Sequence, residues 1–508
     1  MTTGMTTGAT TARSSGSIDI EDVVWRRGVT MRARDGTELV SDLWHPARGG
    51  AWGDGPWPTL VVRAAYGREV ASAVTAPHPS VFARAGYLVV TQDVRGRGDS
   101  GGGPFDPFVH EAVDGADTVA WAAGLPQSDG RVGMYGFSYQ GVVQLAAASM
   151  RPRNLCAIAP AMCAADPAAG FFWTNGTFRL GFATSWGAQL AGVEPRLAER
   201  CKLGRVDEWH RWDKWQAGQC GPAYDVSRIT IPALFTIGWY DTFAAAGWND
   251  LHHYGGATSL LAAPWAHMPW APDGDVAHDA HLAFFAEHVA ARQAALTTPA
   301  VRSLAIGQSQ WRTFETNPGT VRRRFGLASD GRAATRFGDG RLVDGAGEGP
   351  PNIVVHQPAV PVPSVGGLYE PGLGLTGQAD QRAVQERTDV LCYTTAPFDD
   401  DIELFGAARV SLALASEAPT NDACVTLCTV APDGATVNIA FGAARGSGRL
   451  TFDLSPTHAT VPCGWRVRIA IAPSCYPELD LNTSAGPLTQ VTRWLSSDSW
   501  LELEILAP

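Results

Sequence analysis

The sequence has no run of basic residues and no long apolar segment. Its 39 Lys and Arg residues against 50 Asp and Glu residues give a formal net charge of -11. This balance argues against nucleic acid or an anionic membrane as partner, because both require a basic surface. No apolar run reaches bilayer length, and residues 1–16 lack the apolar core of a signal peptide. We therefore expect a soluble cytoplasmic protein that acts on small molecules.

Cysteine is scarce and shows no pairing motif. The nine cysteines, an odd number, are spread from Cys156 to Cys475 without a Cys-x-x-Cys sequence. This distribution is typical of reduced thiols in a cytosolic enzyme and offers no zinc site. The glycine-rich segment 94–103 is not followed by the Gly-Lys-Ser/Thr of a phosphate loop. The sequence therefore predicts neither a metal nor a cofactor.

The first part of the chain alternates short apolar strands with helical segments. An Asp35-Gly36 turn predicts an opening β-hairpin, and the strands predicted after it occupy residues 59–64, 87–93, 132–137, 156–161, 231–241 and 260–263, the last of them closing the sheet. Such alternation is typical of a mostly parallel sheet with helices on both faces. An α/β fold is therefore predicted here, with a tail at residues 1–18.

The alternation changes twice along the chain. Residues 166–227 form helical segments rich in tryptophan and predict a helical cap inserted between two parts of the α/β domain, 19–165 and 228–298. Residues 299–508 contain short β-type runs broken by Gly and Pro, which predict a second, all-β domain. Aromatic residues of a cap usually pack its helices together, but a cap over a cleft also lines that cleft. The candidate substrate contacts are Phe172, Trp173 and Trp186 in the cap, together with Trp239 outside it.

Ser138 stands at the joint between the strand 132–137 and a helix-like run, 142–150. Gly136 and Gly141 flank it in a Gly-x-Ser-x-x-Gly sequence. A sharp strand-to-helix turn needs small residues, and it raises the serine hydroxyl above the sheet. The motif alone is weak because the chain has 56 glycines, so its context must decide.

That context is an acid and a base at later strand ends. Asp241 ends the strand 231–241, and His267 follows the strand 260–263. The order Ser, Asp, His is the one that α/β-hydrolases use. A serine hydroxyl needs a base to take its proton, and the base needs an acid to orient it. Singly, Asp241 is compatible with a turn cap and His267 with an ordinary surface or core histidine. Together with Ser138 they predict a catalytic triad.

The triad also requires donors for the negative oxygen that forms on the attacked carbonyl. The backbone N–H of Tyr139, directly after the nucleophile, is one candidate. Tyr66 is the other, because it follows the strand 59–64 and its phenol, with an ordinary pKa of about 10, is neutral at pH 7. The alternative for Tyr66 is a packed ring whose hydroxyl lies in water.

Taken together, these segments resemble the cocaine esterase and X-prolyl dipeptidyl peptidase superfamily, the CocE/NonD hydrolases. The resemblance spans nearly the whole chain and is carried by Tyr66-Gly67, Asp93-Val94-Arg95-Gly96, residues 136–141, 238–241 and 264–267, and by 310–311, 389–397 and 466–482 in the β domain. It implies an α/β-hydrolase domain, a helical cap and a C-terminal jelly roll. It also implies Ser138, Asp241 and His267 as triad, with Tyr66 and the Tyr139 amide as oxyanion hole.

The family hydrolyses esters and amides, so the resemblance implies a serine esterase or amidase that acts on a small molecule through an acyl-enzyme. An acyltransferase or cyclase, an X-Pro or amino-acyl peptidase, and a binding protein with a vestigial site remain open. Members that bind a substrate amine use a carboxylate cluster near the cap. The carboxylates found there match no such motif: Asp166, Asp207, Glu208 and Asp213. Amine recognition is therefore not predicted, whereas the aromatic cap predicts an apolar or aromatic acyl group. The oligomeric state stays open, a homo-oligomer included.

Overall fold

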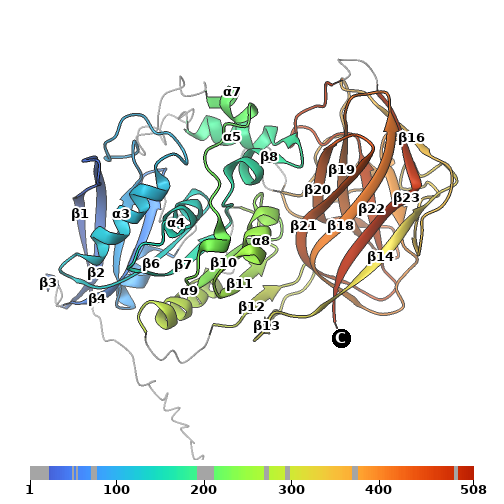
Figure 1. Ribbon diagram of the computed structural model, residues 1–508. Coiled ribbons are helices and arrows are strands. Elements are labelled where there is room, and N and C mark those ends of the chain that lie inside the picture. The colour runs from blue at the N-terminus through green and yellow to red at the C-terminus, as the bar shows by residue number, and fades with distance from the viewer. Residues whose placement is uncertain are drawn as a thin grey trace, which may run out of the picture.

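The computed structural model describes residues 22–48, 51–52, 55–69, 77–190, 211–267, 274–291, 298–368, 376–484 and 490–507. The tail predicted at residues 1–18 lies outside them. An α/β domain and an all-β domain stand side by side, joined near β12 and β13 (Figure 1). Within the described residues, no helix combines the length and the apolar character needed to cross a bilayer.

The α/β domain opens with the predicted hairpin. Strand β1 (Asp22–Arg32) pairs with β2 (Glu38–Arg48), and the register ends with Arg32 opposite Glu38. The turn between them has Gly36 at a φ of 88°, a value that glycine adopts without a steric penalty. Short strand β3 (Ala51–Trp52) pairs with β2, and β2 joins the hairpin to the main sheet through β5.

The centre of this sheet is parallel and buried. Its strands are β4 (Trp57–Ala64), β5 (Leu88–Asp93), β6 (Ser128–Phe137), β7 (Leu155–Ala161), β10 (Ala233–Gly238) and β11 (Thr258–Ala263). They run in the order β5-β4-β6-β7-β10-β11 within an 11-stranded sheet. Parallel strands that are covered on both faces read as nearly continuous apolar runs, and this explains why the sequence located all six.

The sheet does not stop where the sequence predicted. Strand β12 (Val301–Leu304) adds in parallel to β11, with Leu260 opposite Val301, and β13 (Trp311–Phe314) pairs antiparallel with β12. The prediction of 260–263 as the last strand was therefore wrong. A short β-type run predicts a strand, but its pattern does not say which sheet edge it will cover.

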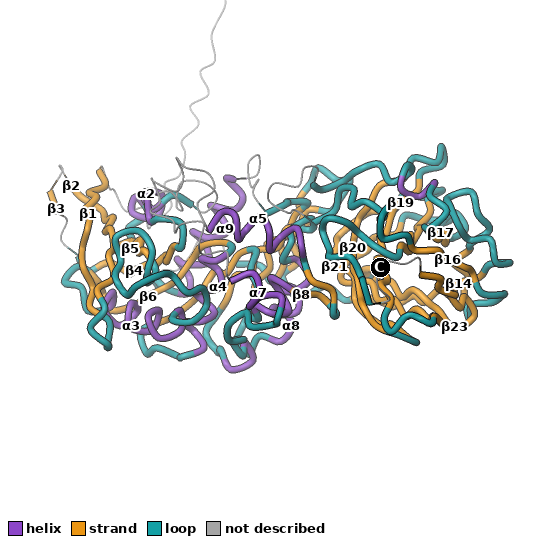
Figure 2. Tube along the Cα trace, turned by 90° about the horizontal axis from the view of Figure 1, so that it is seen from above, coloured by secondary structure: helices purple, strands orange, loops and turns teal. Residues whose placement is uncertain are grey.

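Helices cover both faces of the sheet. Helices α3 (Glu111–Ala123), α4 (Tyr139–Ser149) and α8 (Ala244–His253) pack into one apolar core, and α2 (Pro79–Arg84) and α9 (Gly274–His288) into a second. Figure 2 shows α3 and α8 on the side of the sheet opposite α2. This two-sided cover is the predicted α/β arrangement.

The cap lies over the carboxyl ends of the strands. It contains a short π-helix (Ala168–Phe172), the two-stranded hairpin β8 (Trp173–Thr174) and β9 (Thr177–Phe178), and helices α5 (Leu180–Leu190) and α7 (Arg211–Gln216). Figure 1 shows α5 and α7 above the end of the sheet. Residues 191–210 lie outside the described part of the chain.

The C-terminal domain is all β, as predicted. Its strands are β14 (Thr320–Ala328), β15 (Arg341–Asp344), β16 (Asn352–His356), β17 (Leu391–Thr394), β18 (Ile402–Ser416), β19 (Asn421–Val430), β20 (Thr436–Gly446), β21 (Arg449–Val461), β22 (Arg466–Ala472) and β23 (Gln490–Leu506). The order is β20-β19-β22-β17-β15-β14-β23-β18-β21, with β16 on β23. The two end strands, β20 and β21, follow each other in the chain, so the sheet curls into a nearly closed barrel (Figure 1).

Candidate active site

Ser138 sits in a strained turn between β6 and α4. Its φ of 57° and ψ of -127° are rare for a residue with a side chain, and its N–H donates a 2.9 Å hydrogen bond to the carbonyl of Ala161. Gly136 has a φ of 130°, and a Cβ on it would lie 2.6 Å from the Cβ of Gln140. The turn thus requires glycine at position 136 and holds the Ser138 hydroxyl at the carboxyl end of the sheet.

Gly141 explains the spacing of the motif. A Cβ at this position would lie 2.5 Å from the Sγ of Cys163, in the loop that follows β7. Helix α4 therefore approaches that loop so closely that a larger residue would have to displace it. The glycine needed for this approach comes three residues after Ser138, which gives Gly-x-Ser-x-x-Gly.

The structure brings Ser138, His267 and Asp241 into one hydrogen-bonded line. The Nε2 of His267 lies 3.0 Å from the Oγ of Ser138, and its Nδ1 lies 2.7 Å from the Oδ1 of Asp241. An ionised carboxylate only accepts hydrogen bonds, so Nδ1 carries the ring hydrogen and Nε2 accepts from the serine hydroxyl. Asp241 is fully buried, while Ser138 and His267 retain 8% and 6% of their exposure.

Aromatic rings and the backbone hold the acid and the base in place. The imidazole of His267 lies between the rings of Phe137 and Phe243, at centroid distances of 5.6 and 5.2 Å. The second oxygen of Asp241, Oδ2, accepts a 3.1 Å hydrogen bond from the N–H of Phe243. Both catalytic candidates are therefore restrained by the same loop after β10.

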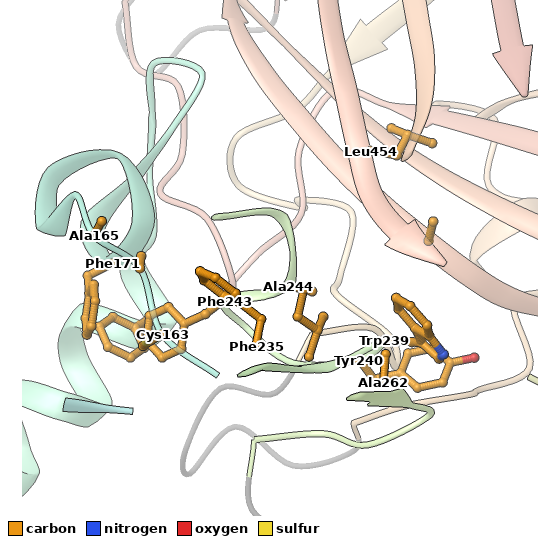
Figure 3. Packing of buried hydrophobic residues seen from close by; sticks show 14 of the residues in the cluster. Cys163, Ala165, Phe171, Phe235, Trp239, Tyr240, Phe243, Ala244, Ala262 and Leu454 are labelled. Atoms are coloured by element: carbon orange, nitrogen blue, oxygen red, sulfur yellow. The ribbon is translucent and has the colours of Figure 1, made fainter. Parts of the chain in front are cut away.

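That loop is also tied to the jelly roll. The indole N–H of Trp239 donates to the carbonyl of Leu304 at 2.9 Å, and its ring packs against Phe405. The hydroxyl of Tyr240 donates to the carbonyl of Asn438 at 3.1 Å. In Figure 3, Trp239 and Tyr240 lie toward the jelly roll and apart from Phe243. These contacts connect Trp239 to the domain boundary, and its role as a substrate contact stays a prediction.

Tyr66 lies beside the nucleophile, where the sequence placed it. Its hydroxyl accepts a 2.8 Å hydrogen bond from the indole N–H of Trp186, and Ser138 lies close enough to influence its pKa. Burial raises the pKa of Tyr66 to about 12, against the smaller opposing effects of Trp186, Arg97 and Ser138. The phenol is therefore neutral at pH 7 and keeps a hydrogen that it can donate.

A buried clamp fixes the loop that carries Tyr66. Gly67 takes a φ of 92°, and the next residue, Arg68, donates from its backbone N–H to Asp93 at 2.6 Å. The guanidinium of Arg68 also bonds Asp93, and its Nε donates to Asp42 at 2.8 Å. Asp93 begins the Asp-Val-Arg-Gly segment on which the family resemblance partly rests. Through Arg68, this segment holds the loop that carries Tyr66.

The backbone N–H of Tyr139 lies at the start of α4, next to Ser138. The first N–H groups of a helix have no intrahelical acceptor, so this one can donate to a group outside the helix. Two buried hydrogen bonds hold the side chain of Tyr139 in place. The hydroxyl donates to the Oε1 of Glu111 at 2.6 Å and accepts from the N–H of Phe108 at 2.9 Å. Burial raises the pKa of Glu111, whereas Arg63, 3.3 Å away, opposes this. Glu111 was not among the residues predicted for the site, because its only signal in the sequence is a carboxylate at the start of a helix with a buried face.

The predicted cap aromatics have different surroundings. Trp186 contacts Tyr66 directly, as described above. Phe172 is buried and stacks on Trp215 at 4.5 Å, and the indole N–H of Trp173 donates to the carbonyl of Trp215 at 2.9 Å. The described contacts of Phe172 and Trp173 are thus within the cap, and their role as substrate contacts remains a prediction.

The cap carboxylates considered for amine binding give no support to that role. Asp166 accepts hydrogen bonds from the N–H groups of Ala168 and Ala169, which places it at the start of the π-helix. Asp207 and Glu208 lie outside the described residues, as does the side chain of Asp213.

A second serine, histidine and acid stand together at the domain boundary. Ser303 lies 2.7 Å from the Nδ1 of His458, whose Nε2 lies 2.6 Å from Glu403. In this cluster Ser303 is fully buried, whereas the carboxylate of Glu403 is accessible to solvent. A substrate carbonyl would meet Glu403 first, so this cluster joins the domains and is not a catalytic site.

The fold and this geometry define a serine hydrolase built on an α/β sheet. Residues 35–210 match the family model of the X-Pro dipeptidyl-peptidase (S15 family), and residues 294–495 match that of the X-Pro dipeptidyl-peptidase C-terminal non-catalytic domain. The chain is 30% identical to a cocaine esterase of Rhodococcus sp. (strain MB1 Bresler), over 90% of this chain and 92% of that protein.

Two solved structures share the architecture at low identity. An aminopeptidase from a marine sediment archaeon, Thaumarchaeota archaeon, gives a TM-score of 0.77 at 19% identity, over 98% of this chain and 99% of the other. An α-amino acid ester hydrolase gives a TM-score of 0.75 at 20% identity, over 98% and 100%. The chain belongs to the superfamily of X-Pro dipeptidyl-peptidases and cocaine esterases, and it is a serine ester hydrolase. The predicted family and fold class are confirmed.

Proposed function

We propose that Ser138, His267 and Asp241 form a catalytic triad that cleaves an ester or amide bond of a small molecule through an acyl-enzyme. The observation that carries this proposal is the unbroken hydrogen-bonded line from Ser138 through His267 to Asp241. Tyr66 and the N–H of Tyr139 stand next to the serine as donors for the developing oxyanion.

In the first half-reaction, Ser138 Oγ attacks the substrate carbonyl carbon while its proton passes to Nε2 of His267. Asp241 accepts from Nδ1–H and stabilises the positive charge on the imidazolium. The carbonyl oxygen becomes negative and receives hydrogen bonds from Tyr66 and Tyr139. When the tetrahedral intermediate collapses, the leaving alcohol or amine takes the proton from Nε2, and the acyl group remains on Ser138.

In the second half-reaction, a water molecule repeats the attack on the acyl-enzyme. His267 takes a proton from the water, the same donors stabilise the second oxyanion, and Ser138 leaves with the proton from Nε2. The products are a carboxylic acid and the regenerated enzyme. No metal or cofactor has a task in this sequence of steps.

We propose that the substrate is an ester with an apolar or aromatic acyl group. The cap presents a cluster of aromatic rings next to Tyr66, and Trp186 belongs to it. The name of the relative, cocaine esterase, also describes an ester hydrolase. Asp166, a carboxylate of the cap, accepts hydrogen bonds from the N–H groups of Ala168 and Ala169 at the start of the π-helix, a structural role.

The experiment is active-site labelling joined to a substrate panel. A fluorophosphonate probe should label the wild type at Ser138 and leave Ser138→Ala unlabelled, with the modified residue located by peptide mass spectrometry. Rates are then compared on p-nitrophenyl esters, amino acid amides and X-Pro anilides, with products analysed with and without added amines. Ester hydrolysis that requires Ser138 supports the proposal. Acyl transfer to the amine in preference to water, or labelling at another residue, contradicts it.

A further inference from the structure

Trp186 connects the cap to the oxyanion side of the site. It lies on α5, while Tyr66 lies 120 residues earlier in the chain, after β4, and the indole Nε1 is 2.8 Å from the Tyr66 hydroxyl oxygen. Trp186 is buried and Tyr66 is partly buried against the same apolar core. A short contact between polar atoms in such a place constrains which atom donates.

The hydrogen inventory of the two groups settles the direction. An indole N–H only donates, so the Tyr66 oxygen must accept in this contact. A phenol has one hydrogen, and with this acceptor position occupied by Trp186 that hydrogen remains for another partner. Ser138 also lies near this hydroxyl, since it opposes the rise in the pKa of Tyr66 that burial causes. The phenol hydrogen is thereby directed toward the reacting atoms.

The Trp186 ring is held rigidly enough to impose this orientation. It stacks on Phe182 and Trp215 with centroid distances of 5.9 and 5.4 Å and interplanar angles of 22° and 26°. Its other neighbours include the ring of Tyr139, at 6.1 Å and 29°. Trp186 therefore contacts both residues that would bind the oxyanion, one through its N–H and one through its ring.

We propose that Trp186 is a positioning residue of the oxyanion hole: its indole N–H fills the acceptor side of the Tyr66 oxygen and aims the phenol hydrogen at the substrate oxygen. This inference rests on the proposed function and extends it to a residue of the cap. A hydrogen bond received by a hydroxyl also strengthens the bond that the hydroxyl donates. In agreement with this, the contact with Trp186 works against the rise in the pKa of Tyr66 that burial causes.

The position of α5 then becomes part of the catalytic geometry. Arg179, directly before α5, donates to the carbonyl of Gly170 at 2.8 Å and to the hydroxyl of Thr242, the neighbour of Asp241. One end of α5 is thus tied to the triad acid loop, and Trp186 ties its middle to the oxyanion hole. A shift of the cap would therefore disturb both the loop that carries Asp241 and the oxyanion hole.

The test is a mutant cycle on an activated ester. Trp186→Phe removes the N–H but keeps an aromatic ring, and we expect kcat to fall about tenfold with KM changing less than about twofold. The affinity for a trifluoromethyl ketone, which forms a tetrahedral oxyanion on Ser138, should fall by a similar factor. In a Tyr66→Phe background, Trp186→Phe should have less than about a twofold further effect, because the acceptor is already gone.

Two further variants separate hydrogen bonding from packing. Trp44→Phe is the matched control, since it makes the same truncation in a ring stack, with Trp25 at 4.6 Å on the opening hairpin, and should leave kcat near the wild-type value. A variant that carries 3-benzothienylalanine at position 186 keeps the shape of the ring and replaces N–H by sulfur. We expect its kcat to fall about tenfold as well. Because the ring shape is kept, this variant tests the N–H independently of any folding defect in Trp186→Phe.

Three results would overturn the inference. They are equal losses in Trp186→Phe and Trp44→Phe, losses that multiply in the Tyr66→Phe background, and wild-type kcat with the benzothienyl side chain. Each leaves the triad intact as a proposal, provided that Ser138→Ala is inactive. Activity retained in Ser138→Ala is the distinct result that removes the proposed function itself.

Discussion

The hydroxyl of Tyr240 donates a 3.1 Å hydrogen bond to the carbonyl of Asn438, so the residue before Asp241 is attached to the jelly roll. The C-terminal domain therefore helps to hold the acid that orients His267. It does so from outside the α/β sheet, through a loop that also contains Trp239.

This attachment predicts a linked loss of activity and stability. Tyr240→Phe removes a buried hydrogen bond, which costs about 1 kcal/mol, and we expect a lower melting temperature together with a several-fold lower kcat. Tyr254→Phe is the control, because its hydroxyl donates to Ile231 within the α/β domain at 2.9 Å. That variant should lose stability without losing kcat. Equal kcat values in all three proteins would show that the jelly roll does not position the acid.

Ser138→Ala should abolish turnover while preserving the fold. The nucleophile is the first atom to react, and loss of a serine nucleophile lowers kcat by about 10⁶. The measurement is kcat on the best p-nitrophenyl ester, with circular dichroism and melting temperature as checks on folding. A variant with more than a trace of wild-type activity would argue for another nucleophile.

Tyr66→Phe should lower kcat by about 10² or more, because a preorganised donor to the oxyanion contributes roughly 3 to 4 kcal/mol to lowering the barrier. KM should change little, since the bond strengthens only as charge develops. The ring remains, so packing against the cap is kept. If KM rises while kcat holds, Tyr66 binds the ground state and does not belong to the oxyanion hole.

The acyl group preference follows from the aromatic surroundings of Tyr66. We expect kcat/KM to be higher for benzoyl esters than for acetyl esters with the same leaving group, because an aromatic ring gains more contact against Trp186 and its neighbours. Because the two esters share a leaving group, a difference in kcat/KM reports on the acyl group alone. No preference for benzoyl would refute the expected aromatic pocket.

His281 should make the protein less stable in mild acid. Burial lowers the pKa of this helix α9 residue from 6.5 to about 4. Above pH 6.5 the imidazole is neutral in both states and its contribution is constant. As the pH falls from 6.5 toward 4, the unfolded chain takes up the proton first, so the free energy of unfolding decreases by up to about 3 kcal/mol.

The check is the pH dependence of thermal unfolding in His281→Leu. This variant should lose less melting temperature between pH 6.5 and 4 than the wild type does. His253→Leu, at an exposed position of α8, serves as the control and should follow the wild type. An unchanged slope in His281→Leu would assign the acid sensitivity to other groups.

Part of the candidate site was predictable because it depends on local patterns. Gly136 and Ser138 mark a strand-to-helix turn that only a small residue permits. Asp241 and His267 each follow a buried parallel strand. The carboxyl ends of parallel strands meet at one edge of a sheet, so residues placed there converge whatever their separation along the chain.

Other parts had no local signal. The packing of the Trp239 ring against Phe405 of the jelly roll joins residues that are far apart in the chain. Strand β12 resembled those of the all-β domain, and only its pairing with β11 assigns it to the α/β sheet. Side-chain direction and strand partnership depend on neighbours that are remote in sequence.

By itself, the sequence determined the α/β framework, the nucleophile turn and the order of three reactive residues, because periodicity and glycine sterics act over a few positions. Only the tertiary structure decided that Trp186 meets Tyr66, that Glu111 locks Tyr139, and that Tyr240 reaches the jelly roll. Each of these contacts joins separate elements of the fold. A hydrogen bond between them forms only after packing has brought donor and acceptor within about 3 Å of each other.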